Sequence, residues 1–535
     1  MKNTTMLAGA RRGYVLVSVL VLSLVASMVV FVSIRENQLQ ERMSGNQQKM
    51  INARLLAEKG VYESIALLRN GLTQQSTTAQ LQTSLTRTEA DYQVSNVSYN
   101  APIFSLISKG GYQDATAYLK ANLAVDNGIA PFDAGVISCE TLEVQGSGQI
   151  DSYDPVNGGY DRNTAGRHAD NAKVEVLNSG ANVNKLDGAS PIRGDVKVNG
   201  NVEVQGSAEI TGSITVSQNL NMSGGGTKIG SANVGGNLTM SPSAQIIGAA
   251  NVVGNVDAKS QTKVGSLSYG GTLTTPQQSG LTATNGTIAN RMPSTPTIQN
   301  KSCDPLNITT AFAGYNGLAS AGSIAGNHGN QKTSYNITPT TAEVYKNDND
   351  KNSTTITNSL ASTANVFSEN KEVHVLDSLH LESASLHISG GDVTIIVKGN
   401  FNTSGGGSSI NVDAGSSLTL LVMGKTELQS NGKFNVSNAG AGVNNGKPPI
   451  SIYSSYSGGE GVRFDGAFDG GYAAVYAPLT AAKIEGRGTL SGAVRAKTLT
   501  VRGAGGLHYD ESLGAVKQAA GPVKVNLVSL SDYYP

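Results

Sequence analysis

The sequence contains no tryptophan, only two cysteines and few charged side chains, which make up 15% of its 535 residues against about 25% in a typical globular chain. Basic and acidic residues number 39 each, so the formal net charge is zero and no basic face for nucleic acid is indicated. No serine elbow, zinc motif or phosphate loop occurs. These absences predict a protein that is not an enzyme and that has no catalytic residue, metal ligand or cofactor.

The two cysteines, Cys139 and Cys303, would both lie in an oxidising compartment if this part of the chain is exported. The sequence does not show how far apart they are in space. A disulfide and a pair of free thiols therefore both stay open at this point.

A long apolar run stands near the N-terminus. Tyr14 to Ile34 carries no charge and, at ~1.5 Å per residue, is about long enough to cross the ~30 Å hydrocarbon core of a bilayer. Lys2, Arg11 and Arg12 precede it, and no small-residue cleavage site of a secretory signal follows it. The run predicts a single span of the inner membrane, with the bulk of the chain extracytoplasmic.

Apolar residues keep a helical spacing beyond the span, from Leu39 to Leu68, and predict one helix over 14–70. A span that continues as an amphipathic rod suits a subunit that packs beside other helices. An anchor followed by a stalk is the alternative.

The segment Arg11-Arg12-Gly13, followed by "YVLVSVLVLSLVASMVV" and then by "LQERMSGNQQKMINARLLAEKGVYES", resembles the N-terminal region of the PilX-type minor pilins of type IV pilus systems. The resemblance implies a prepilin-type leader over 1–13, cleavage by a prepilin peptidase after Gly13, and N-methylation of the new terminus, Tyr14. It also implies other pilin subunits and pilus assembly proteins as partners. A ligand on a surface or on another cell is left open.

The fifth residue after Gly13 is Ser18, where the major pilins of the resembled systems have a glutamate that pairs with a neighbouring subunit's terminal amine. PilX-type subunits share this lack. A carboxylate within lipid is tolerable only when it is paired. The resemblance therefore implies a subunit of the filament tip or of the initiating complex.

Hexads such as "GDVKVN", "GNVEVQ", "GSAEIT" and "GSITVS" repeat from Gly194 to about Gly265. Apolar residues at the third and fifth places predict short strands with two inward side chains, three hexads forming one triangular coil of a parallel β-helix. The predicted inward positions include Val204, Ile210 and Val216, and the outward positions include Glu203, Glu209 and Thr215. The run also resembles the bactofilin-type β-helix, although polymerisation is not expected because a long helix and other segments occupy one end.

The predicted fold class is mainly β, with a long N-terminal transmembrane α-helix followed by a parallel β-helix (solenoid) that has a loop-rich insertion. The expected divisions after the helix are a linker over 71–130, a hexapeptide β-helix over 131–280, a polar insertion over 281–370, a second β-helix region over 371–515 and a tail over 516–535. The stretch "GLHYD" near the end looks like the C-terminal β-rich domain often attached to PilX-type N-termini.

Two groups of residues that include histidine are candidate sites. His374, His380 and His387 fall at outward positions of predicted strands, but they lack a nearby cysteine or carboxylate, so solvated side chains are expected in place of a metal ladder. The cluster from His508 to Glu511 is expected to close the last coil, with Asp510 capping the turn that follows, and is not expected to catalyse.

These observations favour a minor pilin-like structural protein of a type IV pilus assembly system, which inserts its helix into a pilus or priming complex and displays the β-helix for assembly or adhesion. A pseudopilin of a secretion system is one alternative. Another is a membrane-tethered polysaccharide-active β-helix enzyme, for which the scattered outward charges of the hexads and the lack of tryptophan are unfavourable.

Overall fold

The computed structural model describes residues 10–73, 78–100, 103–126, 128–276, 280–325, 334–345, 354–355, 362–367, 369–429, 432–436, 446–466, 471–518 and 524–535. The chain forms two compact units. The first comprises residues 1–127 and 522–535, and the second comprises residues 128–521. The second unit is therefore inserted into the chain of the first.

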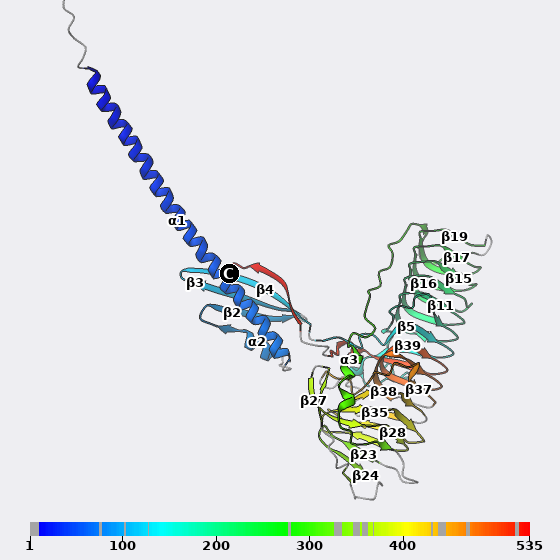
Figure 1. Cartoon of the computed structure of the whole chain (residues 1–535). Coiled ribbons are helices and arrows are strands. Elements are labelled where there is room, and N and C mark those ends of the chain that lie inside the picture. Colours follow the sequence, from blue (N-terminus) through cyan, green and yellow to red (C-terminus); the bar gives the residue numbers. More distant parts are fainter. Residues whose placement is uncertain are drawn as a thin grey trace, which may run out of the picture. The chain divides into compact units, whose positions relative to one another are not determined.

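The first unit consists of a long helix and an antiparallel sheet (Figure 1). Helix α1 runs for 64 residues, and the five-stranded sheet has the order β1-β2-β3-β4-β41. The elements are α1 (Ala10–Thr73), α2 (Thr78–Leu85), β1 (Arg87–Thr88), β2 (Tyr92–Asn100), β3 (Ile103–Tyr112), β4 (Ala115–Asp126) and β41 (Lys524–Asp532). The structure thus has a sheet where the sequence predicted a linker over 71–130 and a tail over 516–535. The tail contains a strand because it pairs with β4. The sequence did not predict this strand, since β4 lies some 400 positions away and local patterns do not reach so far.

Small residues bring α1 close to β3. A Cβ atom on Gly110 would lie 2.1 Å from the carbonyl oxygen of Ala53, and the Ser108 hydroxyl donates to the carbonyl oxygen of Ala57 at 2.7 Å. The core between helix and sheet is apolar and includes Val61, Leu68, Leu85, Phe104, Leu106 and Leu123. The C-terminal half of α1 therefore packs against the sheet of its own unit. The other face of this sheet is exposed, which explains why polar residues alternate with apolar ones along β2.

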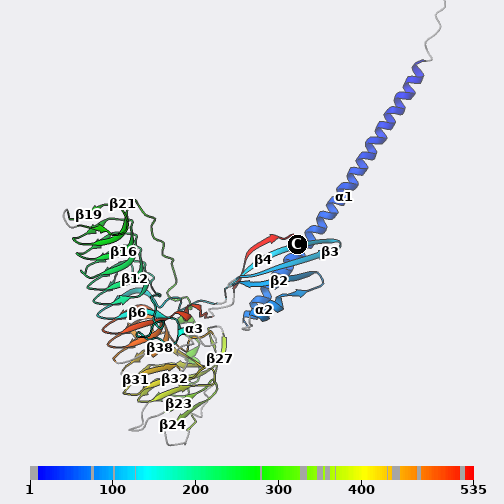
Figure 2. The same ribbon diagram turned by 180° about the vertical axis from the view of Figure 1, so that it is seen from behind.

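The second unit is a parallel β-solenoid, and the whole solenoid has about 14 turns (Figure 2). In its hexad part, equivalent residues of successive coils are 18 positions apart, as in the pairs Val196–Ile214 and Leu220–Leu238. The prediction of three hexads per coil is confirmed. The side chains of Val204, Ile210 and Val216 are buried, at 0–1% exposure, while Glu203, Glu209 and Thr215 are partly exposed, so the predicted register is also confirmed.

The first half of the solenoid contains β5 (Val136–Val144), β6 (Gln149–Tyr153), β7 (Ala172–Val176), β8 (Val183–Leu186), β9 (Pro191–Ile192), β10 (Gly194–Val198), β11 (Asn201–Val204), β12 (Glu209–Val216), β13 (Leu220–Met222), β14 (Lys228–Val234), β15 (Leu238–Met240), β16 (Gln245–Val252), β17 (Val256–Ala258), β18 (Lys263–Tyr269), β19 (Leu273–Thr274), β20 (Thr282–Ala283) and β21 (Ile288–Asn290). A short 3₁₀ helix, η1 (Pro155–Asn157), follows β6.

The polar insertion follows, and the structure describes it in part. It contains an extended segment over 291–307, here called the strap, and then α3 (Ile308–Phe312), η2 (Tyr315–Gly317), β22 (Ile324–Ala325), β23 (Ser334–Ile337), β24 (Ala342–Tyr345), β25 (Thr354–Thr355) and β26 (Ser362–Val366). The strap has no helix or strand along its length.

The second half contains β27 (Glu369–Leu376), β28 (Leu379–Glu382), β29 (Ser385–Ile388), β30 (Asp392–Val397), β31 (Phe401–Ser404), β32 (Ser409–Val412), β33 (Ser417–Val422), β34 (Thr426–Leu428), β35 (Lys433–Val436), β36 (Ile450–Ser454), β37 (Glu460–Phe464), β38 (Gly471–Ile484), β39 (Thr489–Val501) and β40 (Gly506–Asp510), followed by η3 (Glu511–Ala515).

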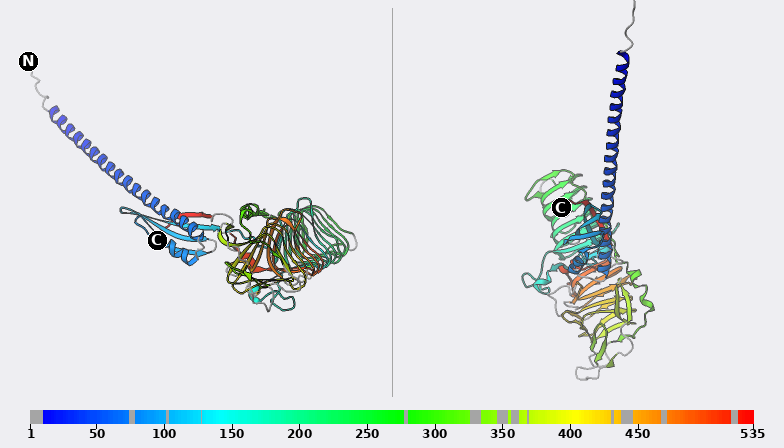
Figure 3. Two further views of the ribbon diagram at one scale, coloured as in Figure 1. Left: turned by 60° about the horizontal axis from the view of Figure 1, so that its bottom comes forward. Right: turned by 90° about the vertical axis from the view of Figure 1, so that its left-hand side faces the viewer.

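The two halves form one continuous solenoid whose middle contains both its first and its last coil. Strand β39 pairs in parallel with β5, and β40 pairs in parallel with β6. This junction is here called the seam. The first half extends from the seam in one direction and the second half lies on the other side of it (Figure 3). After β21, the strap returns alongside the coils of the first half towards α3 (Figures 1 and 2). The two β-helix regions predicted from the sequence are therefore not separate bodies.

Asparagines at one corner of the hexad coils form a ladder. The side-chain oxygen of Asn219 accepts the backbone N–H of Asn237, and that of Asn237 accepts the N–H of Asn255, both at 2.8 Å. At one end of the ladder the side-chain oxygen of Asn201 accepts the backbone N–H of Asn219, and at the other end that of Asn255 accepts the N–H of Thr272. Each bond satisfies a backbone donor at a turn, where the sheet ladder cannot.

Candidate functional site

The N-terminal half of α1 has an apolar surface that no other described element of the first unit packs against. Side chains from Val15 to Ile34 are exposed throughout, the large apolar ones by 48–72%. Among the described helices, α1 alone is long and apolar enough to cross a membrane. Ser18 lies on this half and is exposed. Gly13 and Tyr14 have helical backbone, but the side chain of Tyr14 is outside the described part of the chain, as is most of the predicted leader.

The three histidines of the second half are not brought together. The Nε2 atom of His374 lies 2.6 Å from the carbonyl oxygen of Thr338, that of His380 lies 2.9 Å from the Ser404 hydroxyl, and that of His387 lies 2.7 Å from an Asp413 oxygen. The expected outward position of His374 is wrong, because the strand has the opposite register: His374 pairs with Ile395 of the solenoid core, whereas Val373 and Val375 belong to the apolar cluster that also contains residues of α3. His374 is 1% exposed. His387 also has a carboxylate partner that the sequence did not suggest. The described residues contain no group of three or more metal-ligating side chains.

The cluster predicted to close the last coil lies at the seam. His508 on β40 and Asp151 on β6 occupy paired positions, and their Nδ1 and Oδ1 atoms are 2.5 Å apart. The Tyr160 ring stacks on the His508 ring with 3.5 Å between centroids, and its hydroxyl donates to Asp151 at 2.8 Å. These contacts join the first coil of the solenoid to its last.

Asp510 caps the turn that follows β40, as the sequence predicted. Its Oδ1 accepts the backbone N–H of Ser512 at 2.9 Å, and its Oδ2 accepts the Tyr472 hydroxyl at 2.8 Å. Burial raises the pKa of Asp510, although the hydrogen bonds from Ser512 and Tyr472 act in the opposite direction. Burial also raises the pKa of Tyr472, and the Asp510 charge adds to this effect. The geometry assigns the cluster a structural role in the seam.

The strap crosses the seam and is fastened there. Cys303 on the strap forms a disulfide with Cys139 on β5, with 5.3 Å between their Cα atoms, which decides the choice that the sequence left open. Lys301 Nζ lies 2.8 Å from Asp133 and 2.6 Å from Glu175. Burial alone would lower the pKa of Lys301, but its hydrogen bonds to these two carboxylates raise it. The strap is therefore held by the disulfide at Cys303 and by two ion pairs of Lys301, two residues before it.

Further contacts fasten the strap from the second half. The guanidinium of Arg495 on β39 donates to the carbonyl oxygen of Ser302 at 3.3 Å, and the Tyr476 hydroxyl on β38 donates to Asp304 at 2.7 Å. Sequence reasoning missed these residues because they are far apart in the chain and form no motif. Only the cysteine pair gave a signal.

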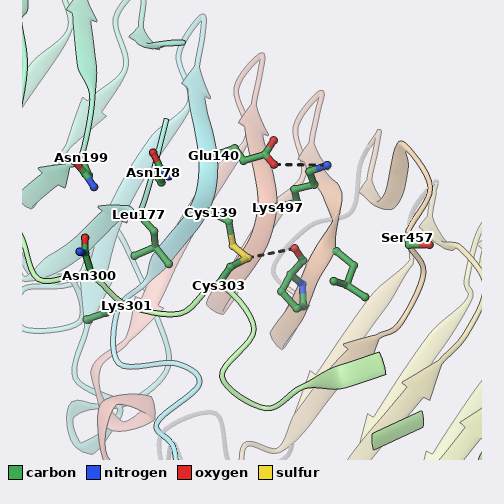
Figure 4. A pocket seen from close by; sticks show the side chains of 12 residues that line it. Cys139, Glu140, Leu177, Asn178, Asn199, Asn300, Lys301, Cys303, Ser457 and Lys497 are labelled. Atoms are coloured by element: carbon green, nitrogen blue, oxygen red, sulfur yellow. Dashed lines mark hydrogen bonds and ion pairs between the residues drawn. A yellow bond between two sulfur atoms is a disulfide. The ribbon is translucent and has the colours of Figure 1, made fainter. Parts of the chain in front are cut away.

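A hollow of about 730 Å³ opens beside the disulfide (Figure 4). Its walls come from the coils on both sides of the seam and from the strap. The lining residues are Cys139, Glu140, Leu177, Asn178, Asn199, Asn300, Lys301, Cys303, Ser457, Pro478, Leu479 and Lys497. Its volume falls within the range of about 300–1,000 Å³ that is typical of small-molecule sites.

A family described as "Domain of unknown function (DUF7305)" matches residues 323–516, which cover the second half of the solenoid. The comparison with curated proteins gave no match. Among solved structures, the chain is similar to the competence-associated pilin ComZ from Thermus thermophilus at 11% identity and a TM-score of 0.23, covering 91% of this chain and 97% of that one. A TM-score of this size does not establish a shared fold.

Proposed function

We propose that the protein is a minor pilin-like structural subunit of a type IV pilus assembly system. In this proposal the exposed half of α1 packs among the helices of other subunits, and the solenoid is displayed for assembly or adhesion. The observation that supports it is the division of α1 into two halves. Side chains over 15–34 are exposed, whereas Ala53, Ala57 and Val61 further along the same helix are fully buried against the unit's own sheet.

The exposed half requires an apolar environment. Burying one large aliphatic side chain is worth about 1.5–3 kcal/mol, and more than a dozen such side chains are exposed between Val15 and Ile34. Lipid can supply this environment before assembly, and neighbouring helices can supply it afterwards. Because the same helix continues into the core of the first unit, a subunit anchored by its N-terminal half carries a folded sheet on a continuous rod.

The resemblance of the first seventy residues to PilX-type minor pilins supports a processing step as well. A prepilin peptidase would cleave after Gly13 on the cytoplasmic side of the inner membrane and leave Tyr14 as the methylated terminus. Ser18 then supports a position where no carboxylate partner is needed, because a serine hydroxyl within lipid bonds back to its own helix.

Quantitative proteomics of sheared filaments tests the proposed position. We expect few copies of this protein per filament, and we expect its deletion to reduce piliation or attachment without changing the composition of the shaft. Abundance close to that of the major subunit contradicts the proposal, and so do full piliation and attachment in the deletion strain. Loss of protein secretion with normal piliation would instead assign the subunit to a secretion pseudopilus.

A further inference from the structure

The hollow beside the disulfide has three amide side chains in its lining. Asn178 and Asn199 follow β7 and β10, which are neighbouring coils, and Asn300 is on the strap (Figure 4). Because Val198 pairs with Val176, Asn199 stands opposite Leu177, one position before Asn178 on the neighbouring coil. The hollow thus has amides both on the coils and on the strap.

These amides have donors to offer. The side-chain oxygen of Asn178 accepts the N–H of Gly180 at 3.2 Å, and that of Asn199 accepts the Ser217 hydroxyl at 2.9 Å. Within the described part of the chain, neither NH₂ group has a hydrogen-bond partner, and neither does the side chain of Asn300 or of Ser457. A ligand in the hollow therefore meets several NH₂ donors and a hydroxyl group.

The charged residues of the lining and their partners balance, with three cations and three carboxylates. Glu140 is paired with Lys497 at 3.6 Å, Lys301 is paired with Asp133 and Glu175, and Arg495 lies 3.6 Å from Asp133. The hollow consequently presents no net field that would select an anion or a cation.

The hollow is also fixed in shape and has an apolar portion. Leu177, Pro478 and Leu479 supply apolar surface, and the disulfide holds the strap in place. A site that is already formed loses little entropy when a ligand binds.

We propose that this hollow binds a neutral oligosaccharide. Each sugar ring offers hydroxyl groups that accept from the amides and donate to Glu140, together with C–H faces for the apolar portion. An extended peptide fits less well, because the coils around the seam already pair with one another and leave no strand edge to which it could add. The lining has no aromatic residue, so the binding rests on hydrogen bonds.

The test uses the full chain in lipid nanodiscs and isothermal titration calorimetry. The probes are chitotetraose, cellotetraose and maltotetraose, with an oligogalacturonate and a ten-residue Ala/Ser peptide for comparison. We expect saturable binding of a neutral tetrasaccharide and weaker or no binding of the other two. In the double variant Asn178→Ala with Asn199→Ala, the affinity should fall about thirtyfold, since each of the two lost hydrogen bonds costs about 1 kcal/mol.

The control variant is Asn290→Ala, which removes an exposed asparagine on β21 and should change the affinity less than twofold. Circular dichroism verifies that both variants are folded. The inference is overturned if no neutral probe binds, if the double variant binds as the unchanged protein does, or if the acidic probe or the peptide binds better. This inference rests on the proposed function, in which the solenoid is displayed, and it adds a class of ligand. The titration requires no filament, so a failure to bind sugar can be distinguished from a failure of the proposed role in pilus assembly.

Discussion

An aspartate placed inside a hexad coil should destabilise the solenoid far more than one placed beside it. Ile210 is 1% exposed and lies between Ile192 and Ile229 of the neighbouring coils. Ile210→Asp removes about 1.5–3 kcal/mol of apolar burial and adds a buried carboxyl group without a partner, which costs at least 1–3 kcal/mol more. A total loss of roughly 2.5–6 kcal/mol follows. Glu209→Asp, one position away and partly exposed, should change stability by no more than about 0.5 kcal/mol.

The assay is urea unfolding of the full chain in nanodiscs, followed by hydrogen exchange of peptides from the hexad coils. A solenoid can open locally, so the exchange data show whether the coils around Ile210 lose protection first. Val204→Asp and Val216→Asp should behave like Ile210→Asp, while Glu203→Asp and Thr215→Asp should behave like Glu209→Asp. Equal tolerance at both sets would refute the strand register.

Three other predictions concern the seam, the strap and the first unit. Burial raises the folded-state pKa of Asp510 above the unfolded value, so protonated Asp510 stabilises the fold at low pH, and this contribution is lost as the pH rises through the folded pKa. Asp510→Asn, which keeps the cap, should flatten that part of the curve of urea midpoint against pH. An unchanged curve would contradict the prediction. Cys139→Ser with Cys303→Ser opens a link that spans 164 positions and should cost roughly 5 kcal/mol in the chain-entropy account, seen as a lower urea midpoint that no longer responds to reductant. Gly110→Leu should destabilise the packing of α1 on β3 by about 3 kcal/mol or more, measured by thermal unfolding, because its Cβ meets the helix backbone. Gly111→Leu, with no atom within 4 Å of its Cβ, should leave the melting temperature unchanged.

Local periodicity made the helix and the hexad coils predictable. The apolar run before Ile34 and the alternation around Val204 each repeat over several turns or strands, so the burial of one residue agrees with that of its neighbours. The 18-residue spacing of Asn219, Asn237 and Asn255 was also present in the sequence, and it could have indicated the corner ladder.

Contacts between distant segments could not be predicted in this way. The pairing of β4 with β41, and that of β39 with β5, are made by backbone groups that leave no record in residue type. His374 looked outward because β27 is buried on both faces, so the alternation of Val373 and Val375 does not show which face belongs to the solenoid core. The hollow depends on the strap returning to the seam, of which Cys139 and Cys303 gave the one visible sign.

Mass spectrometry of the N-terminus of the protein, purified from a filament fraction, tests the central claim most directly. The account predicts a chain that begins at Tyr14 with a methylated amine, and a Gly13→Leu variant that remains an uncleaved precursor in the membrane. A filament-associated chain that retains residues 1–13, or normal processing of the Gly13→Leu variant, would contradict the claim that the exposed half of α1 is a processed pilin-like assembly helix.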